Sequence, residues 1–295
     1  MSDGLADHRA ALALDAELAL APIETALAAQ EGPVADAMRY AVQGGKAIRA
    51  VLVMEGALLF GIDRAMSAPA AAAIEAIHAY SLIHDDLPCM DDDDMRRGKP
   101  TVHRKWDEAT AVLAGDALQA LAFELICDAV CPDTARLALV RGLSRAAGVG
   151  GMVGGQAQDI AAESAAAPLT LDEITGLQAG KTGALICWAA TAGAVMAQAP
   201  ASRVRALQTY GECLGLAFQI ADDILDVEGD AVMTGKAVGK DAAAGKATFV
   251  SLLGLDAARH RATSLVDTAC DALSVFGEEA QSLQALARFV ISRQN

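Results

Sequence analysis

Two clusters of aspartates are the part of this sequence whose residue types and spacing point to chemistry. They are Asp85-Asp86-Leu-Pro-Cys-Met-Asp91-Asp92-Asp93-Asp94 and Asp222-Asp223-Ile-Leu-Asp226. Carboxylates packed this densely repel one another unless a strong positive charge lies between them. Oxygen ligands contributed by several elements suit Mg²⁺, which keeps some waters and shares its remaining positions with phosphate oxygens. The clusters therefore predict an enzyme that acts on a diphosphate.

The second cluster follows the apolar run 214–221, which has helical periodicity. On a helix, Asp222 and Asp226 project to one face, with Asp223 beside them, because residues four apart are neighbours. A solvated charged face is the common alternative for an acidic run. Like charges at this spacing destabilise a helix by a few tenths of a kcal/mol (~0.2–0.5) per pair, however, and no Lys or Arg lies four positions away to compensate. Metal ligation is therefore the favoured interpretation.

In the first cluster, Asp85 and Asp86 end an apolar segment that begins at residue 74. Pro88 is expected to break the helix and turn the chain so that Asp91 points back towards the metal. A calcium loop is the alternative, but the mid-loop glycine of an EF-hand is missing. The remaining carboxylates cannot all be ligands, and we expect them to be solvated or to pair with the two arginines that follow. The predicted metal ligands are Asp85, Asp86, Asp91, Asp222 and Asp226.

Basic side chains around both clusters are the expected partners of diphosphate oxygens. Gly44-Gly45-Lys46-Ala-Ile-Arg49 combines a glycine turn with two cations at the start of a helix, which suits phosphate. A lone histidine such as His78 is more often a core residue, and a lone lysine is more often a surface residue. The other candidates are Arg96, Arg97, Lys181-Thr182 at an expected helix start, Lys236 and Lys246.

Composition favours helices packed on helices. The chain is 54% hydrophobic and 4% aromatic and has 8 prolines, so strand-favouring residues are scarce. The net charge of −15 argues against nucleic-acid binding, which needs a basic surface. The six cysteines have no framework spacing, which indicates reduced thiols. Cys127 and Cys131 could share a helix face, but the second ligand pair of a zinc site is missing.

No membrane span or secretory signal is expected. The start of the sequence lacks a basic region followed by an apolar one. The segment 183–201 is free of charges, but it is built from Ala, Gly and Thr, and a helix buried in a bundle is the better interpretation. These features predict a cytoplasmic protein.

Helical periodicity runs through nearly the whole sequence and is interrupted by Gly and Pro at positions such as Leu87-Pro88 and 97–100. About ten helical segments result, with no convincing alternating strand. Thr170 is the expected cap of one helix, with Glu173 at its third position. No stretch is rich enough in Pro, Gly or Ser to separate domains, so we predict one all-α domain over 1–295.

Together these motifs resemble those of the trans-isoprenyl diphosphate synthases, most closely the bacterial farnesyl-forming members (geranyltranstransferases). The resemblance extends from Gly44 to Thr248 and includes Gly154-Gly155-Gln156-Ala-Gln-Asp159 and Phe218-Gln219. It implies a single polyprenyl synthase domain, in which about ten or more helices surround a central cavity as in other isoprenoid synthases. It also implies a homodimer.

The resemblance further implies a reaction. Three Mg²⁺ ions, with Mn²⁺ as an alternative, would bridge the predicted ligands to an allylic diphosphate. The allylic C–O bond ionises, isopentenyl diphosphate attacks, and loss of a proton completes the step to farnesyl diphosphate. The catalytic residues implied are Asp85, Asp86, Arg96, Lys181, Asp222 and Lys236. The substrate-binding residues implied are Lys46, Arg49, His78, Arg96, Arg97, Lys181, Thr182, Gln219, Lys236 and Lys246.

Product length should depend on where the growing tail meets a wall. Tyr80 and Ser81 precede Asp85 by about one helical turn, and a bulky ring at that depth resembles the farnesyl-forming enzymes. The chain departs from the family pattern at Ala47 and Ala50, where Arg and Pro are usual. The alternatives are a geranylgeranyl or other short-chain synthase, a terpene cyclase, and a regulatory subunit without activity.

Overall fold

The computed structural model describes residues 16–163, 165, 167–228 and 247–292. Over these residues the fold is built of helices, and its strands are two dipeptides in one antiparallel hairpin. The predicted all-α class is therefore confirmed. The chain divides into two compact units, Met1–Val140 and Arg141–Asn295. The prediction of a single domain over 1–295 stays a prediction.

The described part of unit 1 begins with a helix that includes residues 16–27. Its other elements are α2 (Pro33–Val42), α3 (Ile48–Leu58), α4 (Arg64–Asp85), β1 (Met95–Arg96), β2 (Lys99–Pro100), α5 (Val102–Lys105), α6 (Glu108–Cys127) and the first part of α7 (Asp133–Ala147). Unit 2 holds the rest of α7 and then α8 (Met152–Glu163), α9 (Leu171–Gln178), η1 (Ala179–Gly183), α10 (Ala184–Met196), α11 (Ala201–Glu228), α14 (Phe249–Leu253), α15 (Leu255–Ala272), η2 (Leu273–Ala280) and α16 (Gln281–Ser292).

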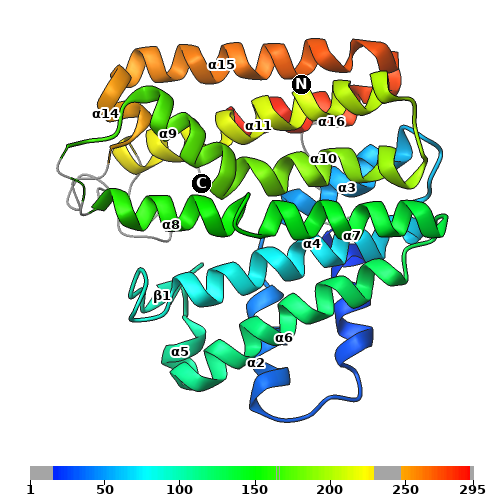
Figure 1. The fold of residues 1–295 in the computed structure, drawn as a ribbon, viewed down its shortest axis with the longest axis vertical. Coiled ribbons are helices and arrows are strands. Elements are labelled where there is room, and N and C mark those ends of the chain that lie inside the picture. The colour runs from blue at the N-terminus through cyan, green and yellow to red at the C-terminus, as the bar shows by residue number, and fades with distance from the viewer. Residues whose placement is uncertain (1–15, 164, 166, 229–246, 293–295) are drawn as a thin grey trace. The chain divides into compact units, whose positions relative to one another are not determined.

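Helix α4 is the centre of unit 1, and it packs against α3 and α6 (Figure 1). Its buried face is rich in alanine, which lets neighbouring helices approach closely. One close contact is at Gly115 of α6, where an added Cβ would lie 2.1 Å from Nε2 of His84. The helix ends at Asp85, three residues before Pro88, as predicted. Packing thus fixes the helix that carries the first aspartate cluster, and the nearby proline accounts for its end.

A two-residue turn joins β1 to β2 just after the first aspartate cluster. Arg97 has a φ of 53° and Gly98 has a φ of 72°, so both lie in the left-handed region that this tight hairpin turn requires. Arg96 pairs with Lys99 across the hairpin. A break at 97–100 was expected from the sequence, but the hairpin was not, because two-residue strands leave no alternating pattern.

Unit 2 is organised around α11, which packs against α10 and α15 (Figure 1). Helix α9 begins with the expected cap, since Thr170 and Glu173 form a reciprocal capping box. The expectation that Lys181 and Thr182 begin a helix is wrong. Both lie in η1, a π-helical turn that continues α9 into α10. Such turns occur frequently at functional sites.

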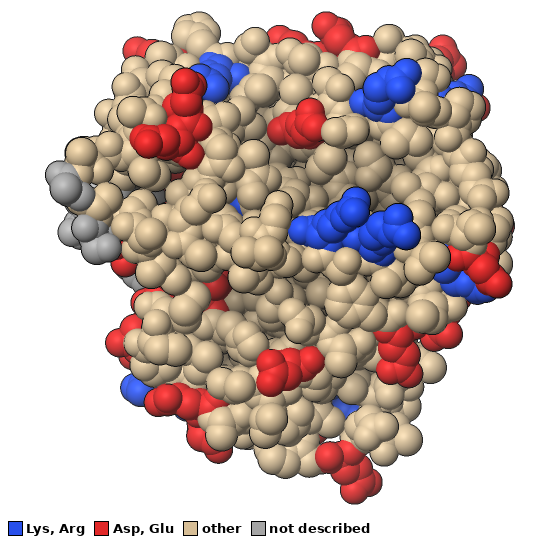
Figure 2. Space-filling view, viewed as in Figure 1, with Lys and Arg blue, Asp and Glu red and all other residues tan. Residues whose placement is uncertain are grey.

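The charge-free segment noted in the sequence contributes α10, a helix of 13 residues that is buried along most of its length. Among the described helices, α6 alone is long and apolar enough to cross a membrane, by length and composition. Half of its apolar window (50%) is buried inside the fold, as in a core helix of a globular protein. Acidic side chains are scattered over the face of the molecule in Figure 2, in keeping with the net charge of −15.

Candidate functional site

The first aspartate cluster folds back on the end of α4. The main-chain N–H of Asp91 donates to the carbonyl of Asp85 at 2.8 Å, so the loop returns to the helix end as expected. Asp92 sits in the left-handed region with a φ of 49°, which a short polar residue tolerates. Asp94 pairs with Arg104 at 2.9 Å on the surface, and not with either arginine that directly follows the cluster.

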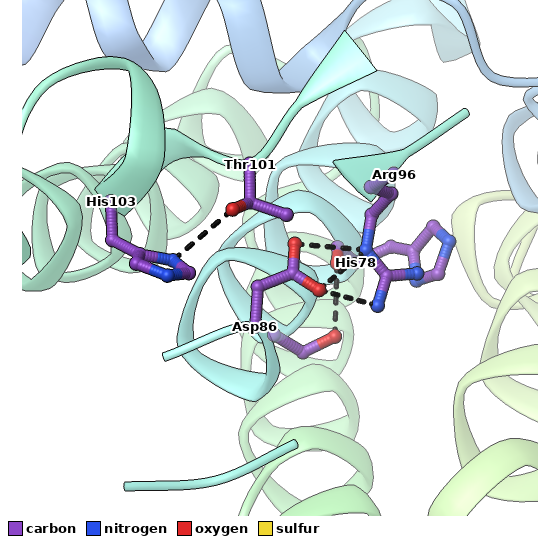
Figure 3. Close-up of polar contacts among 6 residues, drawn as sticks. His78, Asp86, Arg96, Thr101 and His103 are labelled. Atoms are coloured by element: carbon purple, nitrogen blue, oxygen red, sulfur yellow. Dashed lines mark hydrogen bonds and ion pairs between the residues drawn. The ribbon is translucent and has the colours of Figure 1, made fainter. Parts of the chain in front are cut away.

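Asp86 and Arg96 form a buried ion pair (Figure 3). Asp86 is only 3% exposed. Nε of Arg96 donates to both carboxylate oxygens, at 2.8 and 2.9 Å, and Nη2 lies 2.7 Å from Oδ1. Burial raises the pKa of Asp86, Arg96 opposes that shift, and the charges of Asp93 and Asp91 add to it. Asp86 is thus a buried carboxylate whose negative charge is compensated by Arg96.

Glu75 contacts the predicted basic residues and was missed by the sequence interpretation. Its Oε1 accepts a hydrogen bond from the main-chain N–H of Ala50 at 3.0 Å. Burial raises its pKa, while the charges of Arg49 and Arg97 lower it. The available signal was that Glu75, one turn before His78, is the only acidic residue of the apolar stretch 64–84. Glu75 thus lies among the basic groups predicted to bind isopentenyl diphosphate.

The hydrogen bond to Glu75 also explains one departure from the family pattern. Ala50 lies in the first turn of α3, where main-chain N–H groups have no partner within the helix. Glu75 accepts the hydrogen bond from the Ala50 N–H, and a proline at position 50 could not donate it because proline has no N–H. Ala47, the other departure, is buried and has a φ of 45°.

The other predicted basic residues of unit 1 lie near these groups in the chain but differ in exposure. Lys46 is exposed, Arg49 is half-buried, and His78 is half-buried on α4. Arg97 packs against the main chain of Gly45, where an added Cβ would lie 2.9 Å from its Nη1. Its Nη1 also donates to the carbonyl of Gln43 at 3.3 Å. The glycine turn therefore accommodates the Arg97 guanidinium.

A cavity of about 60 Å³ adjoins the buried ion pair within unit 1. Its lining includes Tyr40, Gly44, Leu82, Asp86, Arg97 and Thr101. Pockets for small organic ligands usually measure about 300–1,000 Å³. This cavity is therefore too small for an isoprenoid tail.

Tyr80 lies on the packed side of α4 and is 5% exposed. Its ring meets that of His84 edge-to-face, with centroids 5.8 Å apart. Nε2 of His84 donates to the carbonyl of Val112 on α6 at 3.1 Å. Ser81, the second predicted wall residue, is half-buried and donates to the carbonyl of His78 at 2.9 Å. The Tyr80 ring is thus held by packing near the start of the aspartate cluster.

In unit 2 the second cluster and the η1 turn supply the predicted groups. Nζ of Lys181 lies 2.6 Å from Oδ2 of Asp159 on α8. Gly155 of α8 lets the main chain of the η1 turn approach, since an added Cβ there would lie 2.2 Å from the main-chain nitrogen of Lys181. On α11, Asp222 and Asp226 are half-buried. The predicted residues Lys236 and Lys246 lie outside the described residues.

The Thr182 hydroxyl faces two glutamine oxygens, Oε1 of Gln178 at 3.4 Å and Oε1 of Gln219 at 3.3 Å. Gln219 in turn donates to Asp223. Thr182 and Gln219, both predicted to bind substrate, are therefore brought together within unit 2.

Metal ligation was predicted for five aspartates that lie in both units. Among the residues that the structure describes, no group of three or more His, Cys, Asp or Glu side chains is arranged to hold a metal ion. Asp86 already uses both carboxylate oxygens for Arg96. Ligation by these aspartates therefore stays a prediction.

Comparison with known proteins gives a consistent result. The sequence model of the family described as polyprenyl synthetase matches residues 32–284. The chain is 47% identical over 273 residues to farnesyl diphosphate synthase of Escherichia coli K12, covering 90% of each protein. It is 39% identical to the chloroplastic geranylgeranyl pyrophosphate synthase 11 of Arabidopsis thaliana, covering 98% of this chain and 83% of that one. An FPP/GFPP synthase from Zymomonas mobilis has a similar crystal structure, with a TM-score of 0.85, 46% identity, and coverage of 95% and 99%.

Proposed function

Because the chain belongs to the polyprenyl synthetase family, we propose that it is a trans-prenyltransferase that makes farnesyl diphosphate from isopentenyl diphosphate and dimethylallyl or geranyl diphosphate. The observation that carries this proposal is the 47% identity with a farnesyl diphosphate synthase over nine-tenths of both chains (90%). The family and enzyme class expected from the sequence motifs are confirmed by the same comparison.

Mg²⁺ is the proposed metal, with Mn²⁺ as the alternative. The donors available are carboxylate oxygens of Asp85, Asp91, Asp222 and Asp226, which suit a hard divalent cation. They fit because Asp85 and Asp91 are joined by a main-chain hydrogen bond at the end of α4, and Asp222 and Asp226 are one helical turn apart on α11. When bound, the metal would neutralise the negative charge of the diphosphate that leaves the allylic substrate. Asp86 is the fifth proposed ligand, and its Oδ2, which among the described residues accepts only from Nε of Arg96, keeps a lone pair for the metal.

The basic residues of the chain fall into two proposed groups. Arg96, oriented by Asp86, and Lys181, held by Asp159, stabilise the negative charge that develops on the departing diphosphate. Lys236 is proposed to act with them from outside the described residues.

The second group holds isopentenyl diphosphate, whose double bond must be placed beside the allylic carbon. Lys46, Arg49, His78 and Arg97 form this group, and Glu75 balances the charge of its arginines. Guanidinium groups suit this role because they donate two parallel hydrogen bonds to phosphate oxygens. A terpene cyclase takes no second diphosphate and would have no use for these residues.

Product length is proposed to be set by Tyr80, with Ser81 beside it. The Tyr80 ring is buried and held against His84, so it forms a fixed obstacle near the first aspartate cluster. Geranylgeranyl diphosphate is the second candidate product, because the chain is also 39% identical to a geranylgeranyl pyrophosphate synthase.

We also propose a cytoplasmic homodimer. Val112 and Leu113 on α6 are 41% and 54% exposed and provide apolar surface that a second copy would cover. Sedimentation of the purified protein at twice the monomer mass is the expected result, and a monomer at micromolar concentration would contradict it.

The function is tested by incubating purified protein with Mg²⁺, isopentenyl diphosphate, and dimethylallyl, geranyl or farnesyl diphosphate in turn, followed by chromatography of the products. We expect farnesyl diphosphate from the first two and no elongation of the third. Excess EDTA should abolish turnover. Elongation of farnesyl diphosphate would show the geranylgeranyl alternative, and conversion of geranyl diphosphate alone would show a cyclase. No turnover with any pair would contradict the proposal.

A further inference from the structure

Asp223 differs from the other aspartates of the second cluster in burial and in bonding. It is 4% exposed, whereas Asp222 and Asp226 on the same helix are half-buried. Nε2 of Gln219 donates to its Oδ1 at 2.9 Å, and the main-chain N–H of Phe249 donates to its Oδ2 at 2.8 Å. Each carboxylate oxygen of Asp223 therefore accepts a hydrogen bond from another group of unit 2.

The hydrogen bond from Gln219 connects Asp223 to the η1 turn. An ionised carboxylate can only accept, so Asp223 requires the NH₂ group of Gln219 to point towards it. The amide oxygen of Gln219 then faces Thr182, whose hydroxyl lies 3.3 Å away. Thr182 directly follows Lys181, which is proposed to hold the departing diphosphate. Asp223 is thus linked through Gln219 to the turn that carries two diphosphate-binding groups.

The hydrogen bond from the main-chain N–H of Phe249 connects Asp223 to the start of α14. Phe249 is the first residue of that helix, where main-chain N–H groups have no partner within the helix. Asp223 accepts one of them, and negative charge is favoured at a helix N-terminus. The Phe249 side chain is fully buried in a core cluster with Ile220 of α11. Asp223 and this cluster together fasten α14 to α11.

We propose that Asp223 is a positioning residue that holds the η1 turn and the start of α14 against α11, and that it is not a metal ligand. This inference rests on the proposed function only for the identity of the diphosphate that meets Lys181 and Thr182. It divides the second cluster into Asp222 and Asp226, which remain the proposed metal ligands, and Asp223, which supports the site from within unit 2.

Substitution by Asn or by Ala separates the two roles. In Asp223→Asn, the new amide can accept from Phe249 and donate to Gln219 if the Gln219 amide rotates by half a turn. Gln219 then donates to Thr182, and Thr182 donates to Gln178, so every polar group keeps a partner. In Asp223→Ala, Gln219 and Phe249 both lose their acceptor, and a buried donor without a partner is destabilising. Both substitutions remove the negative charge that a metal ligand would need.

The first measurement is thermal unfolding in EDTA, where metal ligation plays no part. Asp223→Ala is expected to lower the midpoint by about 4–8 °C. Asp223→Asn and the neighbouring control Asp222→Asn are expected to stay within about 2 °C of the unsubstituted protein. A midpoint unchanged in Asp223→Ala would overturn the anchoring role, while failure of that variant alone to fold would support it.

The second measurement is the kinetics of condensation. We expect Asp223→Ala to raise the KM for the allylic diphosphate about tenfold and Asp223→Asn to restore it, with half-saturating Mg²⁺ within about twofold of normal in both. Thr182→Val breaks the same chain of bonds further on and should show the same KM effect. Asp222→Asn should raise the Mg²⁺ requirement instead. If Asp223→Asn raised the half-saturating Mg²⁺ concentration as much as Asp222→Asn does, Asp223 would be a metal ligand and the proposal would be overturned.

The two measurements also separate this inference from the proposed function. If the unsubstituted protein does not condense the two diphosphates, the proposed function fails and every variant lacks a kinetic signal. The unfolding experiment in EDTA still decides whether Asp223 anchors the η1 turn and α14, because it requires neither substrate nor metal.

Discussion

Nε of Arg96 donates to both carboxylate oxygens of Asp86, at 2.8 and 2.9 Å, and Nη2 of the same guanidinium lies 2.7 Å from Oδ1. The side chain of Asp86 is 4% exposed and that of Arg96 is 19% exposed. Removing one partner of such a buried pair leaves the other charge uncompensated, which costs about 3–5 kcal/mol. We therefore expect Arg96→Gln to reduce the free energy of unfolding by about that amount, measured by urea denaturation.

The matched control is the ion pair between Arg104 and Asp94, whose side chains are 57% and 65% exposed. An exposed pair contributes only about 0–1 kcal/mol. Arg104→Gln should therefore lie within about 1 kcal/mol of the unsubstituted protein. Equal losses in the two variants would show that Asp86 and Arg96 are not coupled as a buried pair.

Glu75 should make stability depend on pH. Burial raises its pKa in the folded protein above the ordinary value of 4.5, so the folded state binds more protons than the unfolded state. Stability from this group is present below the ordinary pKa and is lost as the pH rises through the raised one. Glu75→Gln imitates the protonated group and does not titrate. We therefore compare the free energy of unfolding of the two proteins. The value for the unsubstituted protein minus that for Glu75→Gln should fall as the pH rises above about 4.5.

The measurement is urea denaturation of both proteins at a series of pH values from about 4 to 8. Asp36→Asn is a suitable control, because Asp36 is exposed on the surface. A difference between the unsubstituted protein and Glu75→Gln that stays constant, or that rises with pH, would contradict the assignment.

Tyr80 should limit the length of the product. Tyr80→Ala removes the ring that packs against His84 and opens space beside the first aspartate cluster, so longer prenyl diphosphates should accumulate. Tyr80→Phe keeps the ring and removes only the hydroxyl, and its products should match those of the unsubstituted protein. Chromatography of the products from geranyl diphosphate distinguishes them. Unchanged product length in Tyr80→Ala would place the wall elsewhere.

Gly115 should resist substitution although it lies inside a helix. Replacing glycine by alanine at an exposed interior helix position usually stabilises by about 1 kcal/mol. At Gly115 the added Cβ would lie 2.1 Å from Nε2 of His84, so the histidine must leave its hydrogen bond with Val112. We expect Gly115→Ala to lower the unfolding midpoint by about 4 °C or more.

Gly176 in α9 provides the comparison for that substitution, because an added Cβ there meets nothing within 4 Å. Gly176→Ala should raise the unfolding midpoint slightly, by about 1–3 °C. Equal behaviour of the two variants would mean that His84 can move away without cost.

Features that depend on local chemistry could be predicted from the sequence. The end of α4 before Pro88 and the capping box of Thr170 and Glu173 follow from short-range sterics and hydrogen bonds. The all-α class follows from composition and periodicity. The acidic clusters identified the family because their residue types and spacing are recognisable without coordinates.

Features that depend on contacts between distant segments could not be predicted. Spacing treats the aspartates of each cluster alike, but packing buries Asp86 against Arg96 and buries Asp223 between Gln219 and the main chain of Phe249. The role of Glu75 and the π-helical turn at η1 were missed for the same reason. The sequence therefore specified the family and the chemical groups of the site. The fold selected the aspartates that face inward, because burial and partner choice arise from the packing of elements and not from their spacing along the chain.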